Sequence, residues 1–202
     1  MDTRSCEVAG IDCWLSCSGY TGEDGFEISV AAADAESLAR RLLAEAEVEF
    51  IGLGARDSLR LEAGLCLYGH DMDENISPIA ANLLWAISKV RRPGEARAGN
   101  YPGADVIAKQ LGEGTAEKRV LLDVDARAPV REGVNIVNAD GGVLGRVSSG
   151  GFGPSIGRPL VMAYVATSAL TKNEPLFADV RGKLLPLSLR QKPFVEQRYY
   201  RG

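Results

Sequence analysis

The sequence predicts an α+β protein whose two parts follow different patterns, with the change near residues 90–115. The first part combines strand-like alternation with helical periodicity, whereas the last part contains short apolar runs separated by turn residues about every 8 to 12 residues. The segment between them is rich in Pro, Gly and charged residues. We therefore expect an antiparallel sheet with helices over 1–90, a linker with a short helix over 91–114, and a small all-β domain over 115–202.

The first part is predicted to place helices beside few strands. It begins with a short strand-like run, and Ile28 and Val30 alternate with polar residues after a Gly-rich turn. Residues 34–47 are expected to form a helix capped by its first residue, because leucines and alanines fall on one face. Further helices are expected at about 54–62 and 79–89. Because helices need a sheet to cover, this part is expected to be incomplete as a domain.

The last part is predicted to be a small antiparallel barrel or sandwich. After a short helical candidate at Ala104–Gln110, Gly, Pro and Asp turns separate the apolar runs. The Gly- and Ser-rich stretch Ser148–Ser155 lacks the GKS or GKT ending of a phosphate-binding loop, and no helix follows it, so we expect a barrel loop there. The expected strands are Val120–Val124, Val134–Val137, Val143–Val147, Leu160–Val165, Leu176–Val180 and Leu184–Leu189.

Composition excludes several classes of protein. The hydrophobic content of 46% and charged content of 25% are those of a globular chain. The net charge is −4 with both signs interleaved, so no nucleic-acid partner is expected. No apolar stretch approaches the ~18 residues of a membrane span, and the first residues do not form a signal peptide, so neither a membrane nor secretion is expected.

The cysteines are expected to be reduced thiols of an intracellular protein, because no secretory context supports disulfides. They stand at Cys6, Cys13, Cys17 and Cys66, spacings that do not suit most zinc sites, and His70 is the single histidine. No metal site is therefore predicted.

Two neighbouring arginines are candidate ligand-binding residues. Arg56 and Arg60 stand four apart on a predicted helix, so both point the same way and repel each other. An anionic partner would remove this repulsion. Alternatively, Asp57 pairs with Arg60 at i,i+3 on a solvated face, and spacing alone leaves both interpretations open.

Three further residues carry alternatives. Glu27 follows a turn near the start of a strand, where carboxylates are usually solvated; in a pocket, its two oxygens would suit adjacent N–H donors such as those of a pterin. Trp85 lies in an apolar run and is more typical of a core than of a ligand platform. The terminal run Arg198–Tyr200 fits either a frayed tail or a lid.

Two segments are distinctive: GYTGEDGFEI at 19–28 and GLGARDSLRLEAGLCLYG at 52–69. Both closely resemble the T-protein of the glycine cleavage system, and the similarity continues in order along nearly the whole chain. The further matching segments are Val147–Phe152, Pro154–Gly157, Met162–Val165, Val180–Lys183, Lys192–Val195 and Tyr199–Tyr200.

The resemblance implies a three-lobed, folate-dependent aminomethyltransferase. This chain matches the last part of its folate-binding domain and its C-terminal, jelly-roll-like barrel. Such an enzyme takes the aminomethyl group from the lipoyl arm of H-protein, releases ammonia, and passes the one-carbon unit to tetrahydrofolate as 5,10-methylenetetrahydrofolate. H-protein is the implied partner, with functional links to the P- and L-proteins. The implied compartment is the mitochondrial matrix in a eukaryote or the cytoplasm in a bacterium.

The resemblance also assigns residues. Glu27 and Arg56 match the folate-site Glu and Arg of the family, Trp85 matches an aromatic residue of the pocket, and Tyr199 matches a C-terminal substrate contact. No residue here matches the catalytic aspartate of the family, so we expect no aminomethyltransferase activity from this chain alone. His70, where Asn is usual, is expected to be a hydrogen-bonded structural group.

Two other kinds of protein are consistent with the same fold. The relatives include the folate-binding tails of dimethylglycine and sarcosine dehydrogenases and a folate-binding protein of iron–sulfur assembly. The uninterrupted run Leu61–Gly69 favours the T-protein. A non-enzymatic module that docks a lipoylated protein is the alternative from a different class.

Overall fold

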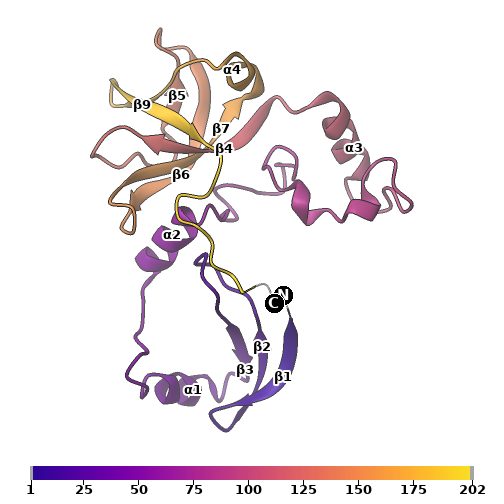
Figure 1. The fold of residues 1–202 in the computed structure, drawn as a ribbon, viewed down its shortest axis with the longest axis vertical. Helices are drawn as coiled ribbons and strands as arrows, with labels where there is room; N and C mark the ends of the chain where they lie inside the picture. The colour runs from indigo at the N-terminus through magenta and orange to yellow at the C-terminus, as the bar shows by residue number, and fades with distance from the viewer. Residues whose placement is uncertain (1, 201–202) are drawn as a thin grey trace.

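A computed structural model describes residues 2–200. Within this range the chain forms a small three-stranded sheet with helices, followed by a closed six-stranded barrel, with α2 between them (Figure 1). The predicted α+β class with a C-terminal β-barrel is confirmed. None of the helices in 2–200 has the length and apolar character needed to cross a membrane.

The three-stranded sheet is antiparallel in the order β1 (Thr3–Val8), β2 (Ile11–Ser16), β3 (Glu27–Val30). Helix α1 (Ala35–Leu42) covers one face, where Leu38 packs in a small core. This helix is shorter than predicted, because after Leu42 the backbone continues through turns closed by i→i−3 hydrogen bonds. Its N-cap residue, Asp34, makes no side-chain capping bond.

Helix α2 (Leu53–Glu62) matches its prediction, whereas the helix predicted at 79–89 is wrong. That segment contains two short 3₁₀ turns, η1 (Leu84–Ala86) and η2 (Lys89–Arg91). Asn82 has a φ of 58°, which places it in the left-handed region and interrupts any right-handed helix. The apolar composition of this run therefore does not produce a regular helix.

The barrel closes in the order β4-β7-β6-β5-β8-β9, with every neighbouring pair antiparallel. Helix α3 (Ala104–Glu113) precedes it, and α4 (Thr167–Lys172), which the sequence did not predict, follows β7. Aliphatic side chains from all six strands fill the interior, and Leu122, Ile136, Val147 and Val161 are fully buried. The strands are β4 (Glu117–Val124), β5 (Asn135–Val137), β6 (Val143–Gly153), β7 (Arg158–Ala166), β8 (Leu176–Val180) and β9 (Lys183–Arg190).

All six predicted barrel strands are present, but the loop predicted at Ser148–Ser155 is wrong over most of its length. Strand β6 continues through Gly153. Gly150 is required inside it, because an added Cβ would lie 2.2 Å from the Val130 carbonyl oxygen. Glycines that read as a loop in the sequence are here strand residues crossed closely by another chain segment.

The two parts meet at α2 and at the end of the chain. The buried carboxylate of Glu62 accepts hydrogen bonds from Ser155 N–H at 2.8 Å and Ser155 Oγ at 2.7 Å. The segment after β9 then runs from the barrel past α2 toward the three-stranded sheet (Figure 1). Val195 N–H donates to the Glu62 carbonyl, and Arg198 N–H donates to the Gly22 carbonyl. The barrel is therefore tied both to the helix and to the loop before β3.

Candidate functional site

An open hollow of about 680 Å³ lies between the start of α2 and the loop that leads into β3. Residues 18–21, 24–27 and 51–53, together with Arg56, line it. Glu27 stands at the first position of β3, and its carboxylate accepts a hydrogen bond from Ser18 Oγ. The structure thus brings two of the predicted residues, Glu27 and Arg56, to one surface.

Tyr20 supports Arg56 within this hollow. The Arg56 guanidinium carbon lies 4.5 Å from the centroid of the Tyr20 ring, a cation–π contact. The Tyr20 hydroxyl donates a hydrogen bond to the Cys66 carbonyl, beyond the end of α2. The aromatic ring is therefore held at one edge by the 65–71 loop and supports the arginine on its face.

The loop that carries Tyr20 is held against the end of α2 by close backbone packing. Gly22 has a φ of +82°, and an added Cβ would lie 2.6 Å from Ala63 Cβ. A side chain at position 22 would thus be excluded both by conformation and by space. The next residue, Glu23, pairs with Arg198 at 3.0 Å.

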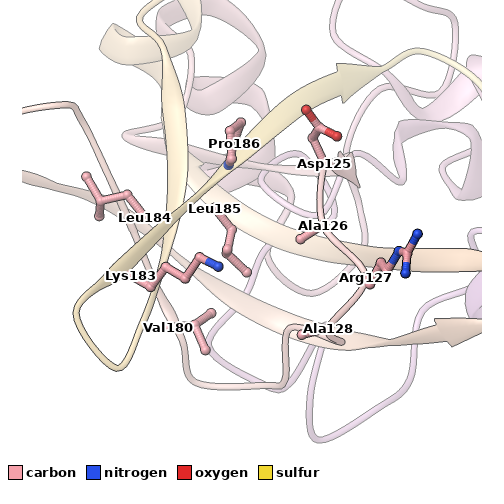
Figure 2. Close-up of a pocket in the computed structure, with 9 residues that line it drawn as sticks. All are labelled: Asp125, Ala126, Arg127, Ala128, Val180, Lys183, Leu184, Leu185 and Pro186. Carbon is pink, nitrogen blue, oxygen red and sulfur yellow. The ribbon is translucent and has the colours of Figure 1, made fainter.

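A second hollow, of about 500 Å³, opens beside the β8–β9 hairpin of the barrel (Figure 2). Residues 125–128 form one side, and Val180 and 183–186 form the other. None of the predicted site residues contributes to it. In the part of the chain that the structure describes, no cluster of three His, Cys, Asp or Glu side chains could hold a metal ion, and the four cysteines are free thiols.

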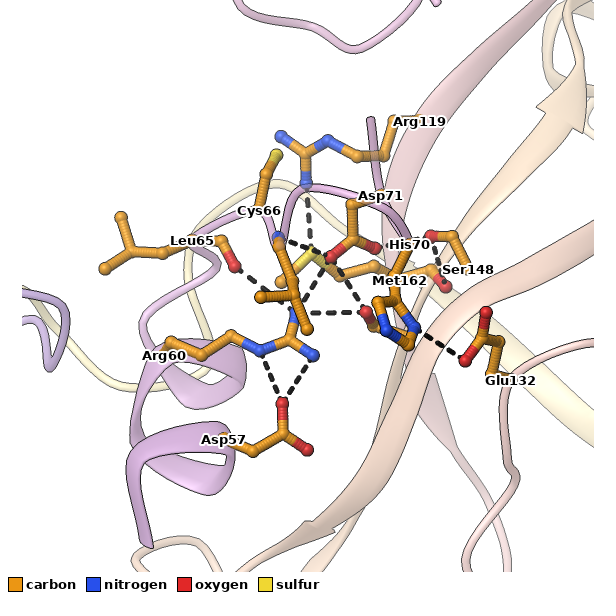
Figure 3. A network of polar contacts seen from close by, with 12 residues as sticks. Asp57, Arg60, Leu65, Cys66, His70, Asp71, Arg119, Glu132, Ser148 and Met162 are labelled. Atoms are coloured by element: carbon orange, nitrogen blue, oxygen red, sulfur yellow. Dashed lines mark hydrogen bonds and ion pairs between the residues drawn. The ribbon is translucent and has the colours of Figure 1, made fainter. Parts of the chain in front are cut away.

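Arg60 does not share the environment of Arg56. The predicted pair with Asp57 is present, with Arg60 Nε 2.8 Å from Asp57 Oδ1, but the expected solvated face is wrong because the Arg60 side chain is 3% exposed. Its Nη1 turns toward the barrel and lies 2.8 Å from the fully buried carboxylate of Asp71 (Figure 3). Arg56 remains exposed at the hollow, so the two arginines have separate partners.

The structure places the other two predicted residues away from the lining of the hollow. Trp85 lies on η1 and is 74% exposed, so the expectation of a core position is wrong. It stands on the irregular segment between α2 and α3, which carries it away from the barrel core. Tyr199 is half-buried and follows Arg198, which contacts Gly22 and Glu23. Their roles in ligand binding stay predictions.

His70 makes the polar contact expected of a structural group. Its Nδ1 lies 2.6 Å from the Glu132 carboxylate, across the gap between the 65–71 loop and the barrel.

Burial also perturbs three groups around this region. It raises the pKa of the Tyr20 phenol, against the opposing effect of the Arg60 and Arg56 cations. It likewise raises the pKa of the Cys66 thiol and, more strongly, that of the Tyr164 phenol. The raised pKa values extend the pH range over which these three groups stay protonated.

Most of the chain matches two protein domain families. The GCVT N-terminal domain matches residues 1–91, and the glycine cleavage T-protein C-terminal barrel domain matches residues 118–196. The chain is a homologue of the glycine cleavage T-protein. The family uses tetrahydrofolate.

Individual relatives agree with the T-protein assignment. Mitochondrial aminomethyltransferase from Flaveria trinervia is 45% identical over 99% of this chain, and a probable mitochondrial aminomethyltransferase from Schizosaccharomyces pombe is 43% identical over 96% of it. The crystal structure of the glycine cleavage system aminomethyltransferase T from Bartonella henselae superposes with a TM-score of 0.86 at 43% identity, over 94% of this chain. The chain spans 48%, 49% and 51% of these proteins, respectively, about half of each.

Sequence reasoning gave no role to several residues in and near the hollow. Tyr20 lay inside a distinctive segment, but no local pattern shows that its hydroxyl reaches position 66. Asp71 and Glu62 are 0% and 2% exposed. Their partners are serines of the predicted loop, Ser148 and Ser149 for Asp71 and Ser155 for Glu62. Such polar residues resemble solvated ones until the fold buries them.

Proposed function

We propose that the chain forms the folate-site and barrel half of an aminomethyltransferase of the glycine cleavage system. The observation that supports this most directly is that Glu27 and Arg56 line one hollow although they come from different elements. A carboxylate accepts hydrogen bonds from adjacent N–H groups, as on the edge of a pterin. A guanidinium supported by the Tyr20 ring suits an anionic, planar ligand. The chemical character of the hollow fits a reduced folate.

In the proposed reaction, the one-carbon unit of the aminomethyl group on the lipoyl arm of H-protein passes to tetrahydrofolate. Ammonia is released, 5,10-methylenetetrahydrofolate forms, and the arm is left as dihydrolipoyl. Glu27 and Arg56 would orient the folate, with Trp85 and Tyr199 as further contacts. The partner is lipoylated H-protein, working alongside the P- and L-proteins. The proposed compartment is the mitochondrial matrix in a eukaryote or the cytoplasm in a bacterium.

Binding of a reduced folate tests this proposal. Titration with 5-methyltetrahydrofolate, a stable reduced folate, should give saturable binding that is abolished by Glu27→Ala and strongly weakened by Arg56→Ala. The matched controls are Glu36→Ala and Arg40→Ala, which break an exposed pair on α1 and should leave the affinity unchanged. Binding of lipoylated H-protein without folate binding would instead favour a docking module, and binding insensitive to Glu27→Ala would contradict the proposed pocket.

Activity of the 202-residue chain alone should be absent. No residue of this chain matches the family's catalytic aspartate, so positioning of the reacting groups and proton transfer would both be incomplete. With aminomethylated H-protein and tetrahydrofolate, ammonia release should not exceed the background rate. Turnover by this polypeptide would show that its own residues suffice.

A further inference from the structure

A buried polar network joins the 65–71 loop to the barrel (Figure 3). At its centre, the Asp71 carboxylate is fully buried and accepts four hydrogen bonds. Oδ2 accepts from Arg60 Nη1 at 2.8 Å, Leu67 N–H at 2.9 Å and Ser149 Oγ at 2.8 Å. Oδ1 accepts from Ser148 Oγ at 2.6 Å. One side chain thus ties α2, the loop and strand β6 together.

The loop held by Asp71 also holds the hollow. Leu67, whose N–H binds Asp71, is covalently next to Cys66, whose carbonyl accepts the Tyr20 hydroxyl. The Tyr20 ring in turn lies under the Arg56 guanidinium. A short chain of contacts therefore runs from the carboxylate to the arginine.

The barrel fixes this loop from two further directions. Tyr164 of β7 donates its hydroxyl to the Asp71 carbonyl at 2.6 Å, and the Arg60 Nη1 group also donates to Ser149 Oγ at 3.0 Å. Because Arg60 stands one helical turn from Arg56, the same network sets the rotation of α2 that presents Arg56 to the hollow. The network thus reaches Arg56 both through the loop and through the helix.

We infer that Asp71 is a positioning residue of the proposed folate site, through which barrel strand β6 holds Tyr20 and Arg56 in place to receive the anionic ligand. This inference rests on the proposed function, because the hollow must bind a reduced folate for the positioning to matter. Asp71 itself is buried at the end of the 65–71 loop, does not line the hollow, and acts through Cys66 and Tyr20.

Fluorine NMR of protein labelled with 3-fluorotyrosine tests the geometric part without any ligand. The chain contains six tyrosines, so the Tyr20 signal is assigned as the one lost in Tyr20→Phe. In Asp71→Asn, an amide nitrogen replaces one acceptor oxygen, and the Tyr20 signal should shift. The matched control is Asp123→Asn, which removes a barrel carboxylate paired with Arg190 and Arg158; there the Tyr20 signal should stay in place.

A milder variant tests the same contact in case Asp71→Asn does not fold. Ser149→Ala removes one donor to Asp71 and should move the Tyr20 signal in the same direction by a smaller amount. Circular dichroism identifies the folded variants. An unchanged Tyr20 signal in folded Asp71→Asn, or in folded Ser149→Ala if Asp71→Asn does not fold, would overturn the inference.

The ligand part of the inference is read from affinity. The Kd for 5-methyltetrahydrofolate should rise roughly two- to tenfold in Asp71→Asn, as for one displaced contact, and stay unchanged in Asp123→Asn. A shifted Tyr20 signal with unchanged affinity would overturn the positioning role. If the unsubstituted chain binds no folate, the proposed function and the positioning role toward folate both fail, whereas the Tyr20 signal still decides whether Asp71 sets the geometry.

Discussion

The two parts of this chain bury their β-sheets in different ways. In the barrel, each of the six strands within residues 117–190 is paired on both sides, and aliphatic side chains fill the interior. In the first part, β1 and β3 are open edges, and Trp14, Phe26 and Phe50 are at least 60% exposed. Closure removes unpaired backbone groups, whereas a three-stranded sheet must find cover elsewhere.

The accessible surface area of the chain is larger than that of a compact protein, in agreement with this open first part. The chain exposes 12974 Å², against roughly 9200 Å² expected for a compact monomer of its mass. The barrel has its own core. The first part depends for its stability on α1, on the C-terminal segment, and on the buried contacts of α2 and the 65–71 loop with the barrel, which we call the joint. The candidate site is therefore stabilised mainly by elements outside the sheet that carries Glu27.

Among the variants that test this comparison, Asp71→Ala is expected to reduce stability most. It would leave the buried Arg60 guanidinium without its buried carboxylate and lower the free energy of unfolding by about 3–5 kcal/mol, measured by urea titration. Asp57→Ala, which removes the partially exposed partner of Arg60, should cost less than about 1 kcal/mol. Equal losses would contradict the view that the buried joint, not the exposed pair, connects the two parts.

A matched pair of core truncations separates the parts. Leu122→Ala in the barrel should lower its stability by about 2–5 kcal/mol, whereas Leu38→Ala on α1 should speed amide hydrogen exchange mainly in β1–β3. Hydrogen exchange read by mass spectrometry distinguishes the two, since locally unfolding units exchange independently. Faster exchange in the barrel after Leu38→Ala would instead indicate one cooperative unit.

The joint should also weaken at alkaline pH. Burial raises the folded-state pKa of Cys66 and Tyr164 above their unfolded values of 9.0 and 10.0. Above these values the unfolded chain releases protons that the folded chain retains, so stability falls as pH rises. The free energy of unfolding should decline from about pH 9 upward, and Tyr164→Phe should flatten the decline above about pH 10. A slope unchanged by Tyr164→Phe would exclude this phenol as its source.

The smallest effect on stability is expected from the exposed apolar residues. Trp14→Ser combined with Phe50→Ser should change the free energy of unfolding by no more than about 0.5 kcal/mol per site. Self-association, measured by light scattering, should nevertheless decrease, because uncovered apolar surface promotes it. Val143→Ser, at an exposed barrel position, provides the control and should leave self-association unchanged.

The sequence predicted the barrel strands well because their signal is local. Apolar runs bounded by turns need no knowledge of the partner strand, and Leu176–Val180 forms a strand with the predicted bounds. The failures occurred where the partner decides the structure. Gly150 reads as a loop residue until the Val130 backbone is known to lie against it, and the apolar run at 79–89 reads as a helix until Asn82 turns into the left-handed region.

The candidate site divides in the same way. Glu27 and Arg56 were found through the distinctive segments that carry them, and the structure places both at one hollow. Tyr20, Asp71 and Glu62 depend on contacts between distant parts of the chain, such as the bond from Ser148 to Asp71. Periodicity cannot reveal such contacts, because each partner alone resembles a solvated polar residue.

The contact between the C-terminal segment and the Gly22 loop before β3 has a consequence for biosynthesis. The Gly22 loop leaves the ribosome well before Arg198, whose N–H fastens it, and the end of α2 leaves well before Val195, which donates to the Glu62 carbonyl. At about 5–20 residues per second, the Gly22 loop waits on the order of ten seconds or more for its contact with Arg198. A nascent chain would therefore hold this loop of the candidate site unfastened throughout that interval, which makes chaperone capture and early proteolysis relevant to its yield.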